Sequence, residues 1–203
     1  MDRPIHNQKP LHLPDAGKDP LALFAHWFAE ATQADPQNAA VVAFSTASRE
    51  GRPSLRMVLL KEYGANGFLF YTNYESRKAA ELTANPFAAM TFWWPSQERQ
   101  VRIEGKVQKI SVEKSDAYFA GRPRDSQLSA WASPQSSVIE GPVTLDKLHE
   151  RFSEGPVPRP ASWGGFILTP ESFEFWQGRA SRLHDRIRFT QTGAAWQTER
   201  LAP

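Results

Sequence analysis

The chain has 203 residues, 40% of them hydrophobic and 23% charged, a composition typical of one globular domain and not of a disordered chain. Its 24 basic side chains nearly balance its 22 acidic ones and are spread along the chain, which argues against a dedicated nucleic-acid-binding surface, and the absence of cysteine excludes disulfides, thiolate metal sites and a cysteine nucleophile. Because no apolar run is long enough to cross a bilayer and no signal-peptide core is present, we expect a cytoplasmic protein that binds neither nucleic acid nor membrane.

The N-terminal part of the chain divides into an arm and a helix start. Residues 1–18 are rich in proline, histidine and lysine, and we expect them to form an extended, flexible arm ahead of one domain over residues 19–203. Asp19-Pro20 is typical of a helix start, with aspartate as the N-cap and proline at the first helical position. The residues that would fall on the apolar face of this helix are Leu21, Phe24, Phe28 and Ala31.

Strands connected by short turns dominate the rest of the chain. Asn66-Gly67 is a strong hairpin signal, and Thr192-Gly193 indicates a second hairpin near the C-terminus. Consecutive strands of this kind favour a mainly β fold with flanking helices (α+β), in which an antiparallel sheet closes into a barrel and the helices pack outside it. The expected strands cover residues 40–46, 54–63, 68–72, 87–94, 100–110, 163–168, 172–177, 183–190 and 195–201.

Four further helices are expected, over residues 77–84, 112–121, 125–132 and 144–153. Ser76 can cap the first of them, and Asn85-Pro86 would end it. Arg77 and Lys78 follow this cap, so backbone N–H groups, the helix dipole and two cations would meet there. This helix start is a candidate phosphate site, and a solvated first turn is the alternative.

A second candidate site lies near the C-terminus. If residues 182–186 are extended, Arg182, His184 and Arg186 share one face of the strand. Three potential cations on one face repel one another, and an anion lying across them would explain the arrangement. A solvated, charged strand is the commoner alternative.

Three other segments carry polar groups that a ligand could use. Arg56 and Lys61 flank an apolar run, which would otherwise be a core strand with exposed ends. Tyr118, Arg122 and Ser126 gather donors suited to a phosphate ester, although they could equally cap a helix.

The loop that contains Gln135 and Ser136 could reach the carbonyls of a ring, but by itself it is only a polar loop. No metal-binding constellation, Rossmann glycine pattern or Gly-x-Ser-x-Gly motif is present, so we expect no metal site.

Taken together, these segments resemble one known family. The sequence WQGRASRLHDR over residues 176–186 resembles the terminal signature of the pyridoxamine/pyridoxine 5'-phosphate oxidases. Further blocks resemble that family in the same order along the chain, and the resemblance covers residues 19–203. These blocks are Arg56–Lys61, Phe70–Asn73, Ser76–Lys78, Glu98–Val101, Arg122–Gln127, Gln135–Ser137, Trp163–Phe166 and Arg200–Pro203.

The resemblance implies an antiparallel split β-barrel that works as a homodimer with FMN at the subunit interface. The implied reaction converts pyridoxine 5'-phosphate and/or pyridoxamine 5'-phosphate to pyridoxal 5'-phosphate, with molecular oxygen as acceptor and hydrogen peroxide as product. The implied cofactor contacts are Arg56, Met57, Val58, Leu59, Leu60, Lys61, Tyr71, Thr72, Arg77, Lys78, Gln100, Gln135, Ser136, Trp176 and Arg186. The implied substrate contacts are Lys61, Tyr118, Arg122 and Ser126, together with Arg182 and His184, which would lie over the pyridine ring as catalytic residues.

The N-terminal arm departs from the family pattern. Family members often carry an Arg-x-x-Tyr element there, whereas residues 1–18 contain only Arg3 and no tyrosine. Two alternatives therefore remain: a related flavin oxidase of phenazine biosynthesis, and a non-catalytic protein that binds FMN or pyridoxal phosphate. The intact segment Arg122–Ser126 favours the vitamin B6 substrate, because it matches the set that holds the substrate phosphate.

Overall fold

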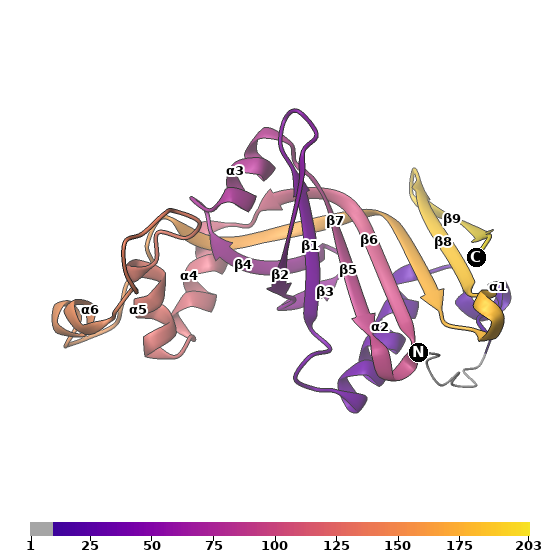
Figure 1. Ribbon diagram of the computed structural model, residues 1–203, viewed down its shortest axis with the longest axis horizontal. Helices are drawn as coiled ribbons and strands as arrows, with labels where there is room; N and C mark the ends of the chain where they lie inside the picture. The colour runs from indigo at the N-terminus through magenta and orange to yellow at the C-terminus, as the bar shows by residue number, and fades with distance from the viewer. Residues whose placement is uncertain (1–9) are drawn as a thin grey trace.

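The computed structural model describes residues 10–203, which form one nine-stranded antiparallel sheet with helices around it (Figure 1). The strands are β1 (Val41–Ala47), β2 (Pro53–Leu59), β3 (Glu62–Gly64), β4 (Gly67–Asn73), β5 (Phe87–Trp94), β6 (Arg99–Lys109), β7 (Trp163–Gln177), β8 (Asp185–Thr192) and β9 (Ala195–Leu201). The helices are α1 (Leu13–Ala16), α2 (Pro20–Ala34), α3 (Arg77–Ala84), α4 (Val112–Ala120), α5 (Arg124–Ala132) and α6 (Asp146–Arg151). Short 3-10 turns span Pro95–Gln97 and Ala180–Arg182.

The sheet curls into a split barrel. Its strand order is β2-β1-β5-β6-β7-β4-β3, and the β8–β9 hairpin pairs with the second half of β7. The two edge strands, β2 and β3, are consecutive in the chain and are separated only by Leu60 and Lys61, so the opposite edges of the sheet must approach each other. Helices α4 to α6 lie at one end of this sheet and the β8–β9 hairpin at the other (Figure 1).

The structure divides one expected strand and joins two others. The strand expected over 54–63 is divided, because Leu60 N–H donates to Ala40 O whereas Lys61 N–H donates to Leu69 O. The chain therefore changes partners at this point. The two strands expected over 163–177 are instead one strand, β7, whose pairing with β6 shifts register beside Gly105. A Cβ added at this glycine would lie 2.0 Å from the backbone oxygen of Thr169, so only glycine allows the approach.

Helix α2 covers one side of the core. It begins as predicted, with the Asp19 side chain accepting a hydrogen bond from Leu21 N–H at 2.9 Å. The fully buried ring of Phe24 lies 4.9 Å from Phe68 on β4 and 5.2 Å from Phe92 on β5. Edge-on aromatic contacts of this kind fix the helix across the curled sheet.

Part of the expected N-terminal arm is folded. Residues 1–9, and with them Arg3, lie outside the described residues. Contrary to the expectation of an extended, flexible arm, residues 13–16 form α1 and Leu11 is buried. Leu11 N–H donates to the Asp185 carboxylate at 3.0 Å, and the Arg200 guanidinium donates to Leu11 O at 2.8 Å. These bonds fasten the segment to the C-terminal hairpin. Within residues 10–203, no helix has both the length and the apolar character needed to span a bilayer.

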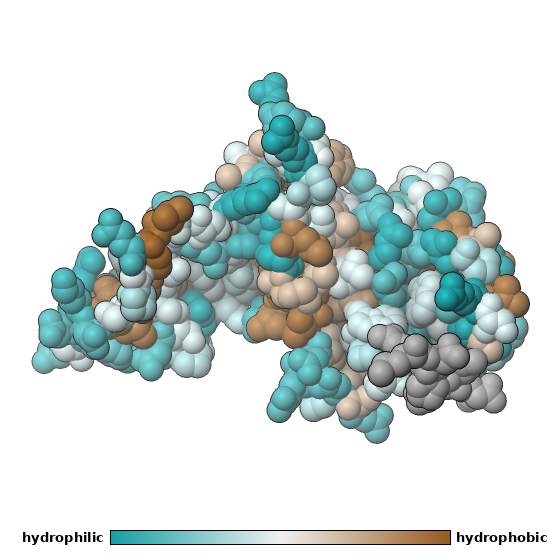
Figure 2. Space-filling view, in the orientation of Figure 1, coloured by the Kyte–Doolittle hydropathy of each residue, from teal (hydrophilic) through white to brown (hydrophobic). Residues whose placement is uncertain are grey.

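One exposed apolar stripe stands out on the surface. Alternate residues of the edge strand β2 point outward, and Leu55, Met57 and Leu59 are 67%, 60% and 49% exposed. Figure 2 shows a hydrophobic patch over the region of β2 in the middle of the displayed face. An edge strand with such a stripe is a surface that another chain could cover.

Candidate active site

A cavity of about 960 Å³ lies between the strands β2 and β4 and helix α3 on one side, and the α4–α5 region with the loop after it on the other. It collects most of the side chains that the sequence suggested for cofactor and substrate. Those that line it are Arg56, Met57, Val58, Leu59, Lys61, Tyr71, Thr72, Arg77, Lys78, Tyr118, Arg122, Ser126, Gln135 and Ser136.

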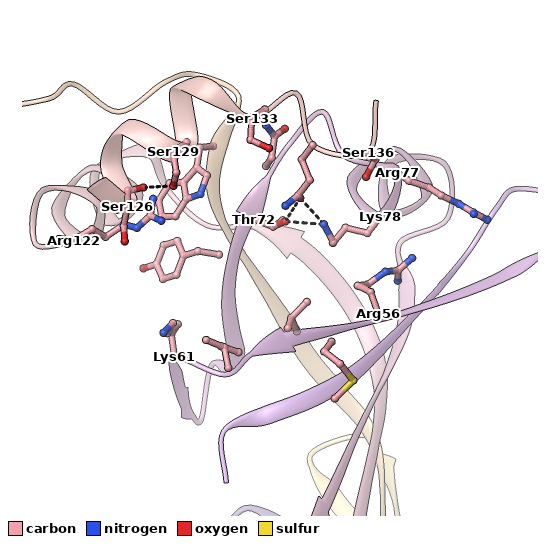
Figure 3. A pocket seen from close by; sticks show the side chains of 18 of the residues that line it. Arg56, Lys61, Thr72, Arg77, Lys78, Arg122, Ser126, Ser129, Ser133 and Ser136 are labelled. Carbon is pink, nitrogen blue, oxygen red and sulfur yellow. Dashed lines mark hydrogen bonds between the residues drawn. The ribbon is translucent and has the colours of Figure 1, made fainter. Parts of the chain in front are cut away.

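The cations of this cavity form two groups. Figure 3 shows Arg56, Arg77 and Lys78 at one end. Lys61 and Arg122 lie at the other end. Two separated positive groups facing one cavity suit a ligand set that carries two anionic groups.

Lys78 is the buried member of the first group. Its Nζ donates to Gln135 Oε1 at 2.7 Å, to Thr72 Oγ1 at 3.0 Å and to Ser76 Oγ at 3.1 Å. Burial, with a smaller contribution from the nearby charge of Arg56, lowers the pKa of Lys78 to about 8. An anion beside this ammonium group would stabilise its charged form.

The predicted cap of α3 is wrong in one detail. Ser76 stands at the N-cap position, but its hydroxyl donates to Asn73 O at 2.7 Å and makes no cap hydrogen bond. The same hydroxyl accepts from Lys78, so it helps to orient the lysine instead. The bond to Asn73 keeps the turn between β4 and α3 in place.

The second cation group contains an unsatisfied donor. The Arg122 guanidinium lies 4.4 Å from the centre of the Trp163 ring, and burial lowers the pKa of this arginine. Its Nη1 is buried and has no hydrogen-bond partner among residues 10–203. Buried guanidinium donors are nearly always paired, so this atom points to an anionic ligand in the cavity.

Flat aromatic rings line the cavity beside Arg122. Tyr71 stacks on Trp163 with ring centroids 5.3 Å apart and planes 7° apart. Burial raises the pKa of Tyr71 to about 12, so its phenol stays protonated at ordinary pH. At the other end of the cavity, near Arg77 and Lys78 (Figure 3), Ser136 has a positive φ of 76°, a conformation that few non-glycine residues adopt.

Several implied contacts do not line the cavity. The side chain of Leu60 is 6% exposed and belongs to the core. Gln100, Trp176 and Arg186 lie opposite one another on β6, β7 and β8, and they form a row across the sheet. The His184 ring is 4.5 Å from the Trp176 ring, which places it at the same end of the sheet.

The expectation that Arg182, His184 and Arg186 alternate along one strand is wrong. Strand β8 begins only at Asp185, and Arg182 belongs to the preceding 3-10 turn. Ser181 and Arg182 have φ values of 58° and 62°, in the left-handed region. Each such non-glycine residue costs on the order of 1 kcal/mol or more, so the turn is held by its surroundings. His184 Nδ1 accepts a hydrogen bond from Arg179 N–H at 3.1 Å, which fixes its ring.

Some lining residues were not found from the sequence. Trp163 reaches the cavity because it pairs with Asn73 in the β4–β7 ladder, a register that spacing along the chain does not show. Ser129 and Ser133 enter through the packing of α5 and its following loop over β4. Glu81 does not line the cavity, but the sequence held a signal for it, because it lies one helical turn after Arg77 and the two form an ion pair.

The described residues contain no group of three or more histidine, cysteine, aspartate or glutamate side chains suited to a metal ion. The polar side chains of the cavity are hydroxyls, amides and cations, which suit phosphate and ring carbonyl groups.

Two family models match the chain. One, described as pyridoxamine 5'-phosphate oxidase, matches residues 28–149. The other, described as the C-terminal dimerisation region of pyridoxine 5'-phosphate oxidase, matches residues 163–203. Together the two matched ranges contain the residues that line the cavity and the row of Gln100, Trp176 and Arg186.

Curated relatives agree with these models. A pyridoxine/pyridoxamine 5'-phosphate oxidase of Pseudomonas putida (strain GB-1) is 53% identical over 191 residues, covering 91% of this chain and 89% of the relative. A protein of the same name from Acaryochloris marina is 46% identical over 202 residues, covering 98% and 92%.

Solved structures show the same fold. PhzG from Burkholderia lata 383, in complex with tetrahydrophenazine-1-carboxylic acid, has a TM-score of 0.87 at 28% identity, covering 98% of this chain and all of that one. A pyridoxamine 5'-phosphate oxidase-related, FMN-binding protein of Nostoc punctiforme has a TM-score of 0.72 at 17% identity, covering 91% and 98%. The likeness to the Nostoc punctiforme protein shows the fold alone.

Proposed function

This chain belongs to the pyridoxamine 5'-phosphate oxidase family of oxidoreductases, and we propose that it binds FMN and oxidises pyridoxine 5'-phosphate and/or pyridoxamine 5'-phosphate. The product is pyridoxal 5'-phosphate, with molecular oxygen as acceptor and hydrogen peroxide as second product. With the amine substrate, the reaction also takes up one water and releases ammonia. The observation that carries the proposal is the pair of separate cation groups in one cavity, since both cofactor and substrate bring a phosphate.

The first cation group fits the phosphate of FMN. Arg56, Arg77 and Lys78 supply positive charge beside the start of α3. Thr72 and Gln135 are already bonded to the lysine, so they fix where its charge lies. When bound, FMN supplies the hydride-type redox chemistry, and the chain supplies binding, orientation and exclusion of water.

The second cation group fits the phosphate of the substrate. Arg122, with its unpaired Nη1, and Lys61 provide charge, while Tyr118 and Ser126 provide hydroxyl groups. A phosphate here would satisfy the buried guanidinium donor that the protein leaves without a partner. The ring of the substrate would then extend toward the middle of the cavity.

A second subunit would complete the site. The match to a dimerisation region over 163–203 and the exposed stripe of β2 both support a homodimer. We place the row of Gln100, Trp176 and Arg186 from one subunit over the cavity of the other. Arg186 would hold a fixed positive charge toward the flavin ring. In the same way, Arg182 and His184 would orient the reacting group of the substrate.

Two alternatives are separable from this proposal. The likeness to PhzG suggests a phenazine-type substrate. The relatives at about 50% identity, however, are named pyridoxine/pyridoxamine 5'-phosphate oxidases. A non-catalytic binding protein would hold FMN or pyridoxal phosphate without turnover.

Aerobic turnover tests the proposal. The purified full chain should be yellow, consume oxygen and release an equal amount of peroxide when given pyridoxine or pyridoxamine 5'-phosphate. A colourless protein without affinity for flavin contradicts it. Retained flavin with turnover of a phenazine precursor and of neither B6 phosphate would favour the first alternative.

A further inference from the structure

We infer that Glu81 is a positioning residue that orients Arg56 and Arg77 toward the phosphate of the flavin, an inference that rests on the proposed function. Glu81 lies on α3, one helical turn after Arg77, and it does not line the cavity itself. It would act only through its neighbours.

The carboxylate of Glu81 is buried among donors from three elements. Its Oε2 accepts hydrogen bonds from Thr46 on β1 and Ser54 on β2, and its Oε1 accepts from Arg77 Nε on its own helix at 2.8 Å. Burial by itself would raise the pKa of Glu81, but these hydrogen bonds outweigh it and lower the pKa to about 2. The group is therefore a fixed negative charge at any working pH.

Arg56 is held through the same two hydroxyls. Its Nη1 donates to Thr46 Oγ1 at 2.7 Å and to Phe44 O at 2.9 Å, and its Nη2 donates to Ser54 Oγ. Each hydroxyl thus accepts from the guanidinium and donates to the carboxylate, whose Oε2 also lies 3.4 Å from Nη2. Because the hydrogen bonds all run from the guanidinium through the hydroxyls to the carboxylate, they hold the side chain of Arg56 in one orientation.

Arg77 is held differently. Its side chain is 64% exposed, yet Nε is tied to Glu81. Within residues 10–203 this is the only hydrogen bond recorded for its guanidinium, so both terminal nitrogens stay available to a ligand. Without the anchor, a long exposed arginine would sample many rotamers, and a ligand would have to order it.

Two other roles for Glu81 make different predictions. As a mere tie between α3 and the sheet, it would affect every ligand of the cavity equally. As an uncompensated negative charge near a phosphate, it would weaken FMN binding, so its removal would strengthen it. Two guanidinium groups and two hydroxyls already surround the carboxylate, which favours orientation over repulsion.

The comparison of FMN with riboflavin separates these roles, because the two flavins differ only by the phosphate. The full chain, freed of flavin, is titrated with each, and quenching of flavin fluorescence gives the dissociation constants. In Glu81→Gln we expect the constant for FMN to rise about tenfold or more, and that for riboflavin to change less than about twofold.

Two further variants serve as a control and as a second test of the inference. Glu30→Gln removes a carboxylate that pairs with Arg99 away from the cavity, and it should leave both constants unchanged. Ser54→Ala removes one of the hydroxyls between Arg56 and Glu81 and should shift the FMN constant in the same direction by a smaller factor. It keeps the inference testable if Glu81→Gln does not fold, as judged by circular dichroism.

Combining Glu81→Gln with Arg77→Gln adds a second readout. If Glu81 acts partly through Arg77 and partly through Arg56, the loss of FMN affinity in the double variant should be larger than in Arg77→Gln alone but smaller than the sum of the two single losses. Equal losses for FMN and riboflavin, unchanged FMN binding or tighter FMN binding would each overturn the inference. A wild-type chain that prefers FMN but does not oxidise a B6 phosphate would instead contradict the proposed function and leave this comparison valid.

Discussion

The ring of Tyr118 on α4 stacks on the ring of Tyr71 on β4, with centroids 3.8 Å apart and planes 7° apart. Tyr71 belongs to the implied cofactor contacts and Tyr118 to the implied substrate contacts. The stack therefore joins the two halves of the cavity, and a change on the substrate side should be felt on the flavin side only if it breaks the stack.

Tyr118→Phe and Tyr118→Leu test this coupling. The phenylalanine keeps the stack and loses one hydroxyl, so the KM for the B6 phosphate should rise about fivefold, as for one lost hydrogen bond, with FMN affinity unchanged. The leucine also removes the stack and should weaken FMN binding by a few-fold. Tyr63→Phe, in the core under α2, is the matched control and should change neither value. Equal FMN affinities in all three variants would show that the stack does not couple the sites.

Arg122→Gln tests the substrate phosphate site. Because the substrate phosphate would lose the buried guanidinium donor of Arg122, we expect the KM to rise about tenfold to a hundredfold while the FMN content stays that of the wild type. Steady-state kinetics and the flavin absorbance of the purified variant measure the two quantities. Arg124→Gln is the control, since that arginine bonds to the backbone oxygens of Phe152 and Gly155. A loss of FMN in Arg122→Gln would contradict this prediction, because it would mean that Arg122 holds the phosphate of FMN and not that of the substrate.

Lys78 makes FMN binding depend on pH. Its pKa is lowered to about 8 in the protein without ligand, and the phosphate of FMN binds the charged form. Affinity should therefore be highest below pH 8 and fall by up to about tenfold per pH unit above it. Titration of the flavin-free protein at several pH values measures this slope.

The same shift has a consequence for stability with the opposite sign. Between pH 8 and the higher pKa of an unfolded lysine, the unfolded chain binds more protons, so the flavin-free protein should become more stable as pH rises through this window. Lys78→Arg stays charged and should flatten both profiles. An FMN affinity that is independent of pH in the wild type would remove Lys78 from the phosphate site.

Mixed dimers test whether the site is shared between subunits. Arg122→Gln damages the cavity, and Arg182→Ala combined with His184→Ala damages the C-terminal turn. If one subunit supplies each part, co-expression of the two impaired chains restores one intact site in about half of the dimers. At a substrate concentration well below the raised KM of Arg122→Gln, the activity should reach about a quarter of the wild-type value. No recovery, despite isolation of the mixed dimer, would place both parts in the same subunit.

The sequence was most informative where a local chemical rule decides the structure. Asp19-Pro20 began α2, and Asn66-Gly67 joined β3 to β4, because capping and hairpin turns depend on neighbouring residues alone. The structure also brings together in one cavity the five cations that the resemblance grouped, which are Arg56, Lys61, Arg77, Lys78 and Arg122. Only the resemblance to a family joined their segments, because Arg56 and Arg122 are 66 residues apart in the chain.

Long-range packing decided the features that the sequence missed. The partner change at Leu60 and Lys61 depends on which strands lie on either side, and the docking of α1 depends on Asp185 and Arg200 far along the chain. Ser181 and Arg182 form a left-handed turn although neither is a glycine, the residue that usually signals such a turn in a sequence. The prediction that these residues alternate along a strand was therefore wrong. No pattern within one chain could show which residues a second subunit would supply.

Anaerobic reduction of the bound flavin tests the central claim most directly. The yellow wild-type protein is mixed without oxygen with pyridoxine 5'-phosphate, with pyridoxamine 5'-phosphate or with a phenazine precursor. We predict that the flavin absorbance is lost with one or both B6 phosphates, that pyridoxal 5'-phosphate appears in equal amount, and that admission of oxygen restores the colour. Flavin that stays oxidised with both B6 phosphates would contradict the account.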